Sequence, residues 1–219
     1  MEFVQSEFAS ELFLRIDQTK RDRILSVAVE EFASFGYSGA NVNRIAQSAG
    51  ISVGALYKYF ATKNDLFLYI VEVAFNRMTL YVEQIIHQDS HVFEKLEHLL
   101  RLAKTYSLKD PVLIRLYSVF TSESDEARAG MIAQKIEGVT SGAYRELIRL
   151  AQEKGEIRND IDPGVLAFLV DNQLISMQFS FACFYYRKRF SMFVGAQDDE
   201  QSELVIKSII KALKSMLEP

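Results

Sequence analysis

The stretch "NVNRIAQSAGISVGALYKYFATK", residues 41–63, places two small residues ahead of a group of polar-tipped and cationic side chains. A continuous helix would favour larger residues than Ala46 and Gly50 at their positions. In a helix-turn-helix, the first helix approaches the second closely, so position 46 tolerates little beyond a methyl group, and position 50 needs the left-handed backbone that suits glycine. The stretch therefore predicts a helix over 42–48, a tight turn, and a second helix over 53–59.

Both short helices carry start signals and need a support. Asn41 and Ser52 are residue types that cap helix N-termini. Helices of this length do not persist alone, so we expect them to dock on a longer helix over 18–35, with Gly36 as its C-terminal cap. Three apolar side chains are expected to fill the small core between the helices: Ile45, Ile51 and Leu56.

Polar-tipped and cationic residues gather on and just after the second short helix: Tyr57, Lys58, Tyr59 and Lys63. A surface helical hairpin without a ligand would explain the small residues equally well, but it gives no reason for this group. Duplex phosphates would lie at these positions if the helix entered a DNA groove. The DNA-binding hypothesis requires three of them, Tyr57, Tyr59 and Lys63, to face away from the protein interior.

Charge is distributed unevenly along a chain whose formal net charge is −4. Residues 15–63 contain seven cationic and four anionic side chains, whereas the rest of the chain has 18 cationic and 25 anionic ones. A cationic N-terminal module joined to an acidic body is the asymmetry expected when one end meets a polyanion.

The whole 219-residue chain has a helical period and few strand signals. Thr62 and Asp65 form a capping box, and Asp162-Pro163 is typical of the start of a helix. Six helices are predicted after the short pair: 62–86, 92–107, 111–121, 124–154, 163–188 and 199–217. A change in composition near residue 65 predicts a DNA-binding domain over 1–65 and a larger helical domain over 66–219. Within the first domain, residues 1–16 are an extra segment, and their four-residue apolar spacing suits a short amphipathic helix: Val4, Phe8, Leu12 and Ile16.

The segment "ILSVAVEEFASFGYSGANVNRIAQSAGISVGALYKYFATKNDLF", residues 24–67, resembles the DNA-binding region of the TetR family of bacterial transcriptional regulators. The resemblance covers about the first 85 residues, and beyond them only "KGEIRNDIDP" and the helical pattern are similar. It implies an all-α fold with an N-terminal three-helix DNA-binding domain followed by a ligand-binding and dimerisation domain. It also implies a dimer that binds a palindromic operator in double-stranded DNA, with helix 53–59 in the major groove, and that lets go when a small molecule enters the second domain.

Carried over by position, the resemblance gives candidate DNA contacts at Asn41, Val53, Ala55, Tyr57, Tyr59 and Lys63. The secondary candidates are Asn43, Arg44 and Lys58, of which Arg44 is more typical of a solvated helix residue, and Ser52 and Gly54 complete the candidate set at the start of helix 53–59. Asn41 stands where a Thr or Ser usually caps the helix and touches phosphate. Val53 replaces a usually polar residue and Ala55 a common Thr or Ser, so few polar base contacts are expected from the start of helix 53–59. Thymine-methyl contact by either side chain is physically reasonable.

The larger domain is expected to bind a small apolar or amphipathic effector. Aromatic or soft side chains on the middle helices suit a pocket wall: Tyr106, Tyr117, Tyr144, Met177, Phe181 and Tyr185. Each alone is more typical of a plain core, and only as a set do they favour an apolar ligand. Helices 163–188 and 199–217 are expected to form a homodimer as an intermolecular four-helix bundle, which the resemblance implies. In "FYYRKR", residues 184–189, three cations are predicted to lie at a helix C-terminus.

Other functions are disfavoured by what the sequence lacks. No nucleophile motif or glycine-rich phosphate loop is present, so neither an enzyme nor a cofactor is predicted. His87 and His91 are four residues apart, but in a predicted loop, and no metal site is expected. Asp171, Asn172 and Gln173 interrupt the best membrane-span candidate, the N-terminus lacks a secretory signal, and Cys183 is the single cysteine. We therefore expect a cytoplasmic protein without a membrane anchor.

The sequence leaves one alternative open. The chain could be a helical protein-interaction or apolar-ligand-binding module that no longer binds DNA, because Val53 and Ala55 depart from the family pattern.

Overall fold

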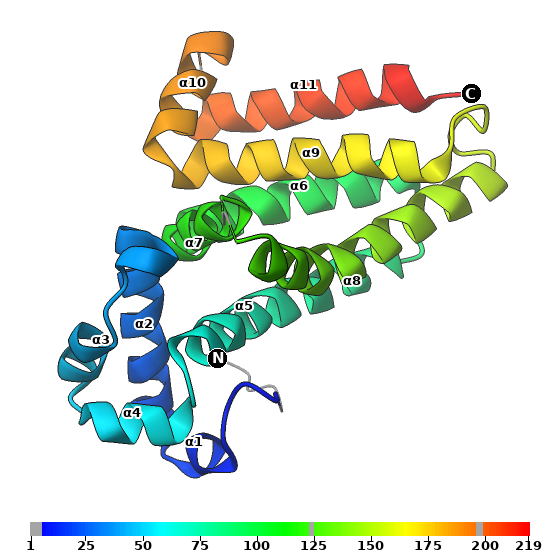
Figure 1. Ribbon diagram of the computed structural model, residues 1–219. Helices are drawn as coiled ribbons and strands as arrows, with labels where there is room; N and C mark the ends of the chain where they lie inside the picture. Colours follow the sequence, from blue (N-terminus) through cyan, green and yellow to red (C-terminus); the bar gives the residue numbers. More distant parts are fainter. Residues whose placement is uncertain (1–5, 123–124, 196–198) are drawn as a thin grey trace. The chain divides into compact units, whose positions relative to one another are not determined.

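The computed structural model describes residues 6–122, 125–195 and 199–219, and the described chain is helical without strands (Figure 1). This confirms the predicted all-α fold. The helices are α1 (Glu11–Arg15), α2 (Gln18–Gly39), α3 (Val42–Ala49), α4 (Val53–Tyr59), α5 (Lys63–Ile86), α6 (Val92–Lys109), α7 (Pro111–Thr121), α8 (Glu126–Glu153), α9 (Pro163–Ala182), α10 (Phe184–Val194) and α11 (Asp199–Leu217).

The chain divides into two compact units. The first comprises Met1–Met78 and Arg115–Ile136, and the second comprises Thr79–Ile114 and Glu137–Pro219. The first unit thus extends beyond the predicted boundary at residue 65 and also takes in a later segment. Three helices, α5, α7 and α8, contribute residues to both units.

Aromatic rings form much of the core of the first unit. Phe67 of α5 lies with its ring centroid 4.9 Å from that of Phe32 on α2 and 5.0 Å from that of Phe120 on α7. All three side chains are almost completely buried. Burial of this kind, worth roughly 1.5–3 kcal/mol per large side chain, holds the short helices α3 and α4 to a stable support.

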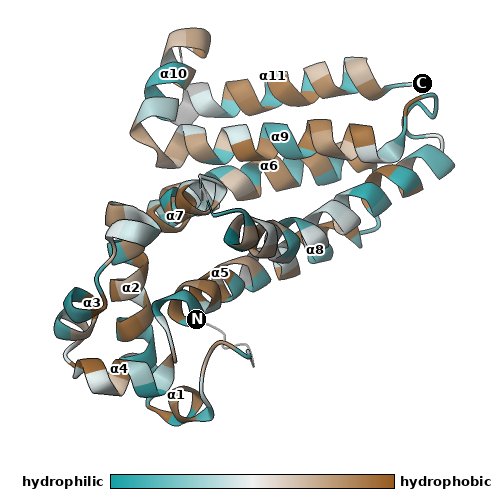
Figure 2. Ribbon diagram, viewed as in Figure 1, coloured by the Kyte–Doolittle hydropathy of each residue, from teal (hydrophilic) through white to brown (hydrophobic). Residues whose placement is uncertain are grey.

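The second unit has its own aliphatic core. α6 packs against α9 and α11, and the core includes Leu96, Leu174 and Ile206 from these three helices. Hydrophobic residues recur along α9 (brown in Figure 2), which is the one helix in the described residues that is long and apolar enough to cross a membrane. α9 packs against α6 and α10, and 44% of its apolar stretch is buried.

The predicted start signals at Asp162-Pro163 and at the Thr62–Asp65 capping box are confirmed, and the predicted start at 124 lies outside the described residues. Two predicted helix ends differ from the structure. Asp162 accepts hydrogen bonds from the backbone at the start of α9, and Thr62 and Asp65 form the expected reciprocal capping box. Gly36 has φ +67°, but the helix resumes after this kink and ends at Gly39. The predicted helix 163–188 breaks at Cys183, whose backbone is extended (φ −110°, ψ 130°).

The break at Cys183 changes the place of the cationic cluster. Arg187, Lys188 and Arg189 lie in α10, which begins at Phe184, and not at the C-terminus of the preceding helix. The Arg187 guanidinium donates a hydrogen bond of 2.8 Å to the Phe181 carbonyl. A carbonyl near the end of α9 thereby gains a partner in place of the next helical turn.

The N-terminal segment also differs from its predicted pattern. Val4 lies outside the described residues, and the helix observed is α1, five residues long and capped by Ser10. Its buried side chain is Phe13, whereas Leu12, on the predicted apolar stripe, is 50% exposed. The four-residue spacing therefore predicted the wrong face of this segment as the buried one.

Candidate nucleic-acid interface

α3 and α4 form a helix-turn-helix with the backbone geometry that the sequence predicts. Gly50 has φ +72° and ψ 32°, and the N–H of Ile51 donates to the Ala46 carbonyl over 3.0 Å. A Cβ at Gly50 would also lie 3.4 Å from the Arg23 guanidinium. A side chain at position 50 would have room beside Arg23, so the unfavourable φ is what restricts this position to glycine.

The two helices meet across small and apolar side chains. Ala46 is 1% exposed, and Ile45 and Leu56 are equally well buried. Ile45 and Leu56 confirm two of the three members expected in this small core, whereas the third, Ile51, is only half-buried. Because the methyl group of Ala46 is enclosed, a larger side chain there would push α3 away from its neighbours.

The predicted N-terminal caps are confirmed. The side-chain oxygen of Asn41 accepts from the Asn43 N–H over 2.8 Å, and the Ser52 hydroxyl accepts from the Ala55 N–H over 3.1 Å. Each cap satisfies a backbone donor that the first helical turn leaves unpaired. Both residues therefore define where α3 and α4 begin, whatever else they contact.

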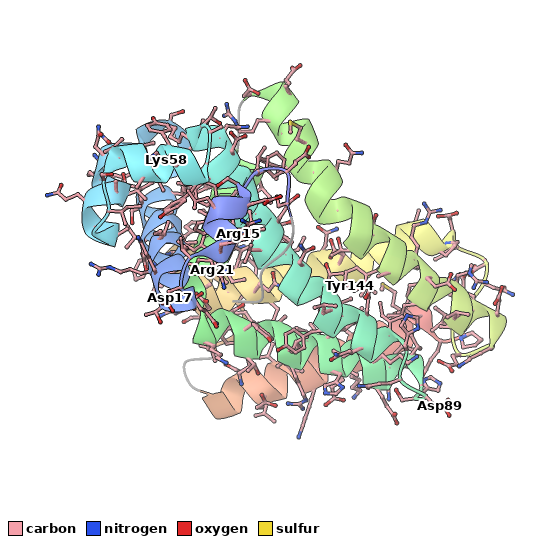
Figure 3. The ribbon with its side chains drawn as sticks, turned by 90° about the horizontal axis from the view of Figure 1, so that it is seen from below. Arg15, Asp17, Arg21, Lys58, Asp89 and Tyr144 are labelled. Atoms are coloured by element: carbon pink, nitrogen blue, oxygen red, sulfur yellow. The ribbon has the colours of Figure 1, made fainter. Side chains whose placement is uncertain are left out.

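Part of the candidate DNA-contact set lies on the solvent face. Tyr57 is 47% exposed, and Lys58 is exposed on α4 (labelled in Figure 3). Asn43, Ser52 and Gly54 are exposed, whereas Asn41, Val53 and Ala55 are half-buried. This face offers a hydroxyl and an ammonium group for phosphates and a small apolar surface near the start of α4.

Of the three side chains expected to face away from the protein interior, Tyr57 does so, Tyr59 does not, and Lys63 is half-buried. Tyr59 is 7% exposed, and its ring centroid lies 5.6 Å from that of Phe13. The Lys63 ammonium donates to the Tyr37 carbonyl over 2.8 Å and to the Ala40 carbonyl over 3.2 Å. Tyr59 is part of the core, which does not suit the phosphate-holding role predicted for it. Lys63 joins the start of α5 to the segment before α3, and its contact with phosphate stays a prediction.

Arg44 is also held by the protein. Its guanidinium nitrogens donate to the Glu31 carboxylate, at 2.9 Å for Nε, and to the Gly39 carbonyl at 3.0 Å. The guanidinium carbon lies 4.5 Å from the centre of the Phe35 ring. Arg44 is thus neither free nor simply solvated, and its first role is to tie α3 to α2.

Glu31 is the acceptor at the centre of this connection. The carboxylate is 9% exposed, and it accepts from the Asn41 N–H over 2.8 Å as well as from Arg44. Burial alone would raise the pKa of Glu31, but the hydrogen bonds from Arg44 and Asn41 outweigh it and the pKa is lowered. The charged carboxylate therefore orients the start of α3.

α1 supports the C-terminal end of α4. This contact was not predicted from the sequence. The Ser10 N–H donates to the Tyr59 carbonyl over 2.9 Å, and the Ser10 hydroxyl donates to the Lys58 carbonyl over 2.8 Å. The Phe13 ring lies 4.6 Å from Phe60 between centroids. The signal available in the sequence was the cap at Ser10 with an aromatic residue three positions later, not the four-residue spacing.

The candidate effector residues do not all fit one pocket wall. Tyr117 belongs to the first unit and the other five to the second. Tyr185 is 72% exposed, which does not suit a pocket wall, and Met177 is part of the aliphatic core. Tyr144 is buried and also lines a cavity.

Comparison with known proteins agrees with the helix-turn-helix geometry. Residues 24–70 match the model of the family described as bacterial regulatory proteins, tetR family. The chain belongs to the TetR family. The matched segment contains α3 and α4 entirely, so this TetR-family chain carries the family's helix-turn-helix in the region where the exposed face of α4 lies.

Similarity to individual proteins extends beyond the matched segment. The chain is 27% identical over 156 residues to the probable acrEF/envCD operon repressor of Escherichia coli (strain K12), covering 69% of this chain and 70% of that protein. A TetR family transcriptional regulator from Chloroflexus aurantiacus J-10-fl has a similar structure, with a TM-score of 0.68, 20% identity and coverage of 97% and 99% of the two chains. The regulator FadR from Bacillus subtilis, solved in complex with stearoyl-CoA, gives a TM-score of 0.71 at 18% identity over 88% of this chain and 96% of that one. The two structural similarities concern the fold.

Proposed function

We propose that this TetR-family regulator is a cytoplasmic repressor that binds a palindromic operator as a homodimer and is released by a small, largely apolar effector. The observation that carries the proposal is the exposed face of α4, where Tyr57 and Lys58 are accessible beside a helix-turn-helix with intact caps. An accessible second helix that offers hydrogen-bond donors is what phosphate contact and groove entry require.

The exposed apolar side chains of α9 and α11 support the homodimer. On α9, Val165 is 51% and Phe168 is 67% exposed, and on α11 Leu204 is 58% exposed. Large apolar side chains left in solvent at this density mark an interaction surface. A second copy would bury them in the intermolecular helical bundle expected for this family.

α5 supplies a mechanical route from effector to DNA. The helix contributes residues to both units, and at its first residue Lys63 holds the carbonyls of Tyr37 and Ala40. Movement of α5 on effector binding would shift the segment that precedes α3. The two α4 helices of a dimer would then no longer match a duplex repeat of about 34 Å.

Selection of bound fragments from a pool of random-sequence duplexes tests the proposal. The expected result is an enriched site with two inverted half-sites, whose centres are separated by about one helical turn or a multiple of it. Recovery of no specific duplex would favour the alternative of a helical interaction module without DNA affinity. Enrichment of a single half-site would contradict the dimeric mode of binding.

A further inference from the structure

The second unit contains a partly open cavity of about 380 Å³ between α8 and α9. Its lining is mixed in chemistry: Glu137 and Tyr144 come from α8, and Ala167, Phe168, Asp171 and Ile175 from α9. The volume is that of a site for a small organic molecule.

Tyr144 is an unpartnered polar side chain at this cavity. The residue is 6% exposed and lines the cavity (labelled in Figure 3). Its hydroxyl has no hydrogen-bond partner within the described ranges. Buried tyrosine hydroxyls normally find a partner, so the cavity lacks an acceptor for this group.

Two carboxylates face the same space. Asp171 has no ion pair or hydrogen bond from its side chain in the described part of the chain, and the Thr140 hydroxyl lies 3.4 Å from the Glu137 carboxylate as a donor. Arg145 also borders the cavity, where it lies beside Gly164, and it forms no ion pair with Asp171. The negative charge of Asp171 therefore has no cationic partner within the described protein.

The electrostatic setting of Asp171 is unfavourable to an isolated carboxylate. Burial, and to a smaller extent the charge of Glu137, raises the pKa of Asp171 to about 6. Burial and then the two carboxylates raise the pKa of Tyr144, so its hydroxyl remains a protonated donor. Near neutral pH, a cation bound beside Asp171 would offset the free-energy cost of keeping its carboxylate ionised in this partly buried position.

The remaining wall is apolar in part. Ala167 is buried and Ile175 is half-buried, whereas Ser141 and Asn172 add polar groups to the lining. Aromatic and aliphatic walls bind the apolar part of a ligand, and an aromatic face also attracts an organic cation.

We propose that this cavity binds an organic cation with an apolar body, its charged centre beside Asp171 and Glu137 and its body against Ala167 and Ile175. The Tyr144 hydroxyl donates to an acceptor on the same molecule. This inference rests on the proposed function and gives the chemical class of the effector.

Two rigid ions of matched shape and opposite charge, tetraphenylphosphonium and tetraphenylborate, test the site by titration calorimetry on the full-length protein. The phosphonium is expected to bind, and Asp171→Asn to weaken it by at least about tenfold, because a charge at close range in a partly buried site contributes more than that. Glu153→Gln, which removes the same charge from an exposed position on α8, is the matched control and should leave the affinity unchanged. Any borate binding should be insensitive to Asp171→Asn.

The pH dependence gives a second readout that needs no variant. The phosphonium requires the ionised carboxylate, so its affinity should fall as pH is lowered through about 6, the pKa of Asp171. Glu137 and Arg145 also border the cavity, and the raised pKa of Tyr144 keeps its hydroxyl neutral across this window. An affinity that is flat between pH 5 and pH 8, or one that neither Asp171→Asn nor Glu137→Gln alters, overturns the assignment.

The experiments distinguish a failure of the cation site from a failure of the proposed regulatory function. If the selected duplex binds but no phosphonium binding depends on Asp171, the cation site is wrong and the regulator proposal stands. If the phosphonium binds as expected but does not release the duplex, the site stands and the effector response is contradicted.

Discussion

Replacing Phe13 by alanine is expected to lower the free energy of unfolding by about 3–5 kcal/mol and to weaken DNA binding. The side chain is fully buried, and its ring contacts three other aromatic rings, on Tyr59, Phe60 and Tyr69. Removal leaves a cavity beneath the end of α4, which the surrounding rings cannot fill without moving. The Ser10 hydrogen bonds to the last carbonyls of α4 depend on the same α1 segment.

Urea denaturation followed by circular dichroism measures the change in stability. Leu12→Ala is the matched control, because Leu12 is in the same helix but is half exposed, and it should cost much less. If Phe13→Ala lowers the free energy of unfolding by no more than Leu12→Ala does, α1 is not a support of α4.

Ala46→Leu is expected to have the second-largest effect. The methyl group is 1% exposed, and the added carbons must displace α3 from its neighbours at a cost of about 1–3 kcal/mol. Because α4 is joined to α3 by a turn of three residues, the exposed face of α4 should change its angle to the duplex. A misplaced recognition helix forms fewer contacts with the duplex, so we expect operator affinity to fall by about 5- to 150-fold, which corresponds to the roughly 1–3 kcal/mol that each good contact supplies.

Anisotropy titration of a labelled selected duplex measures this change in affinity. Ala127→Leu makes the same substitution at an exposed helical position of the first unit and should leave the affinity within about twofold, since surface changes are usually within ±0.5 kcal/mol. Equal affinities for the Ala46 and Ala127 variants would show that the crossing of α3 and α4 does not set DNA binding.

The sequence predicted the helix-turn-helix because its requirements are local. Asn41 and Ser52 define helix starts through their own side chains, and Gly50 is needed for one backbone angle. The family resemblance added the role of α4. None of these conclusions depends on where distant segments pack.

The sequence-based predictions were wrong where a contact with a distant part of the chain determines whether a side chain is buried or held. Tyr59 is buried because α1 brings Phe13 against it, and the spacing of apolar residues in the first 16 positions pointed to Leu12. Lys63 is held by carbonyls of Tyr37 and Ala40, which helix periodicity does not reveal. The break at Cys183 has neither glycine nor proline to announce it.

The candidate effector set failed for a similar reason. Aromatic residues on helices serve a core, a pocket or an exposed surface equally well, and the unit to which each belongs follows from the tertiary fold. The cavity beside Tyr144 depends on Asp171 and Glu137 lying near each other on two helices, although they are far apart in the chain.

The most direct test of DNA recognition by α4 is the salt dependence of duplex binding for the unmodified protein and for Lys58→Gln. If the exposed face of α4 lies on duplex phosphates, affinity should fall steeply as salt rises, and Lys58→Gln should reduce the slope of log affinity against log salt by about 1 for each phosphate that is no longer neutralised. Lys154→Gln, an exposed lysine in the second unit, should keep the full slope. Affinity that is independent of salt, or a Lys58→Gln slope equal to that of Lys154→Gln, would contradict recognition through α4.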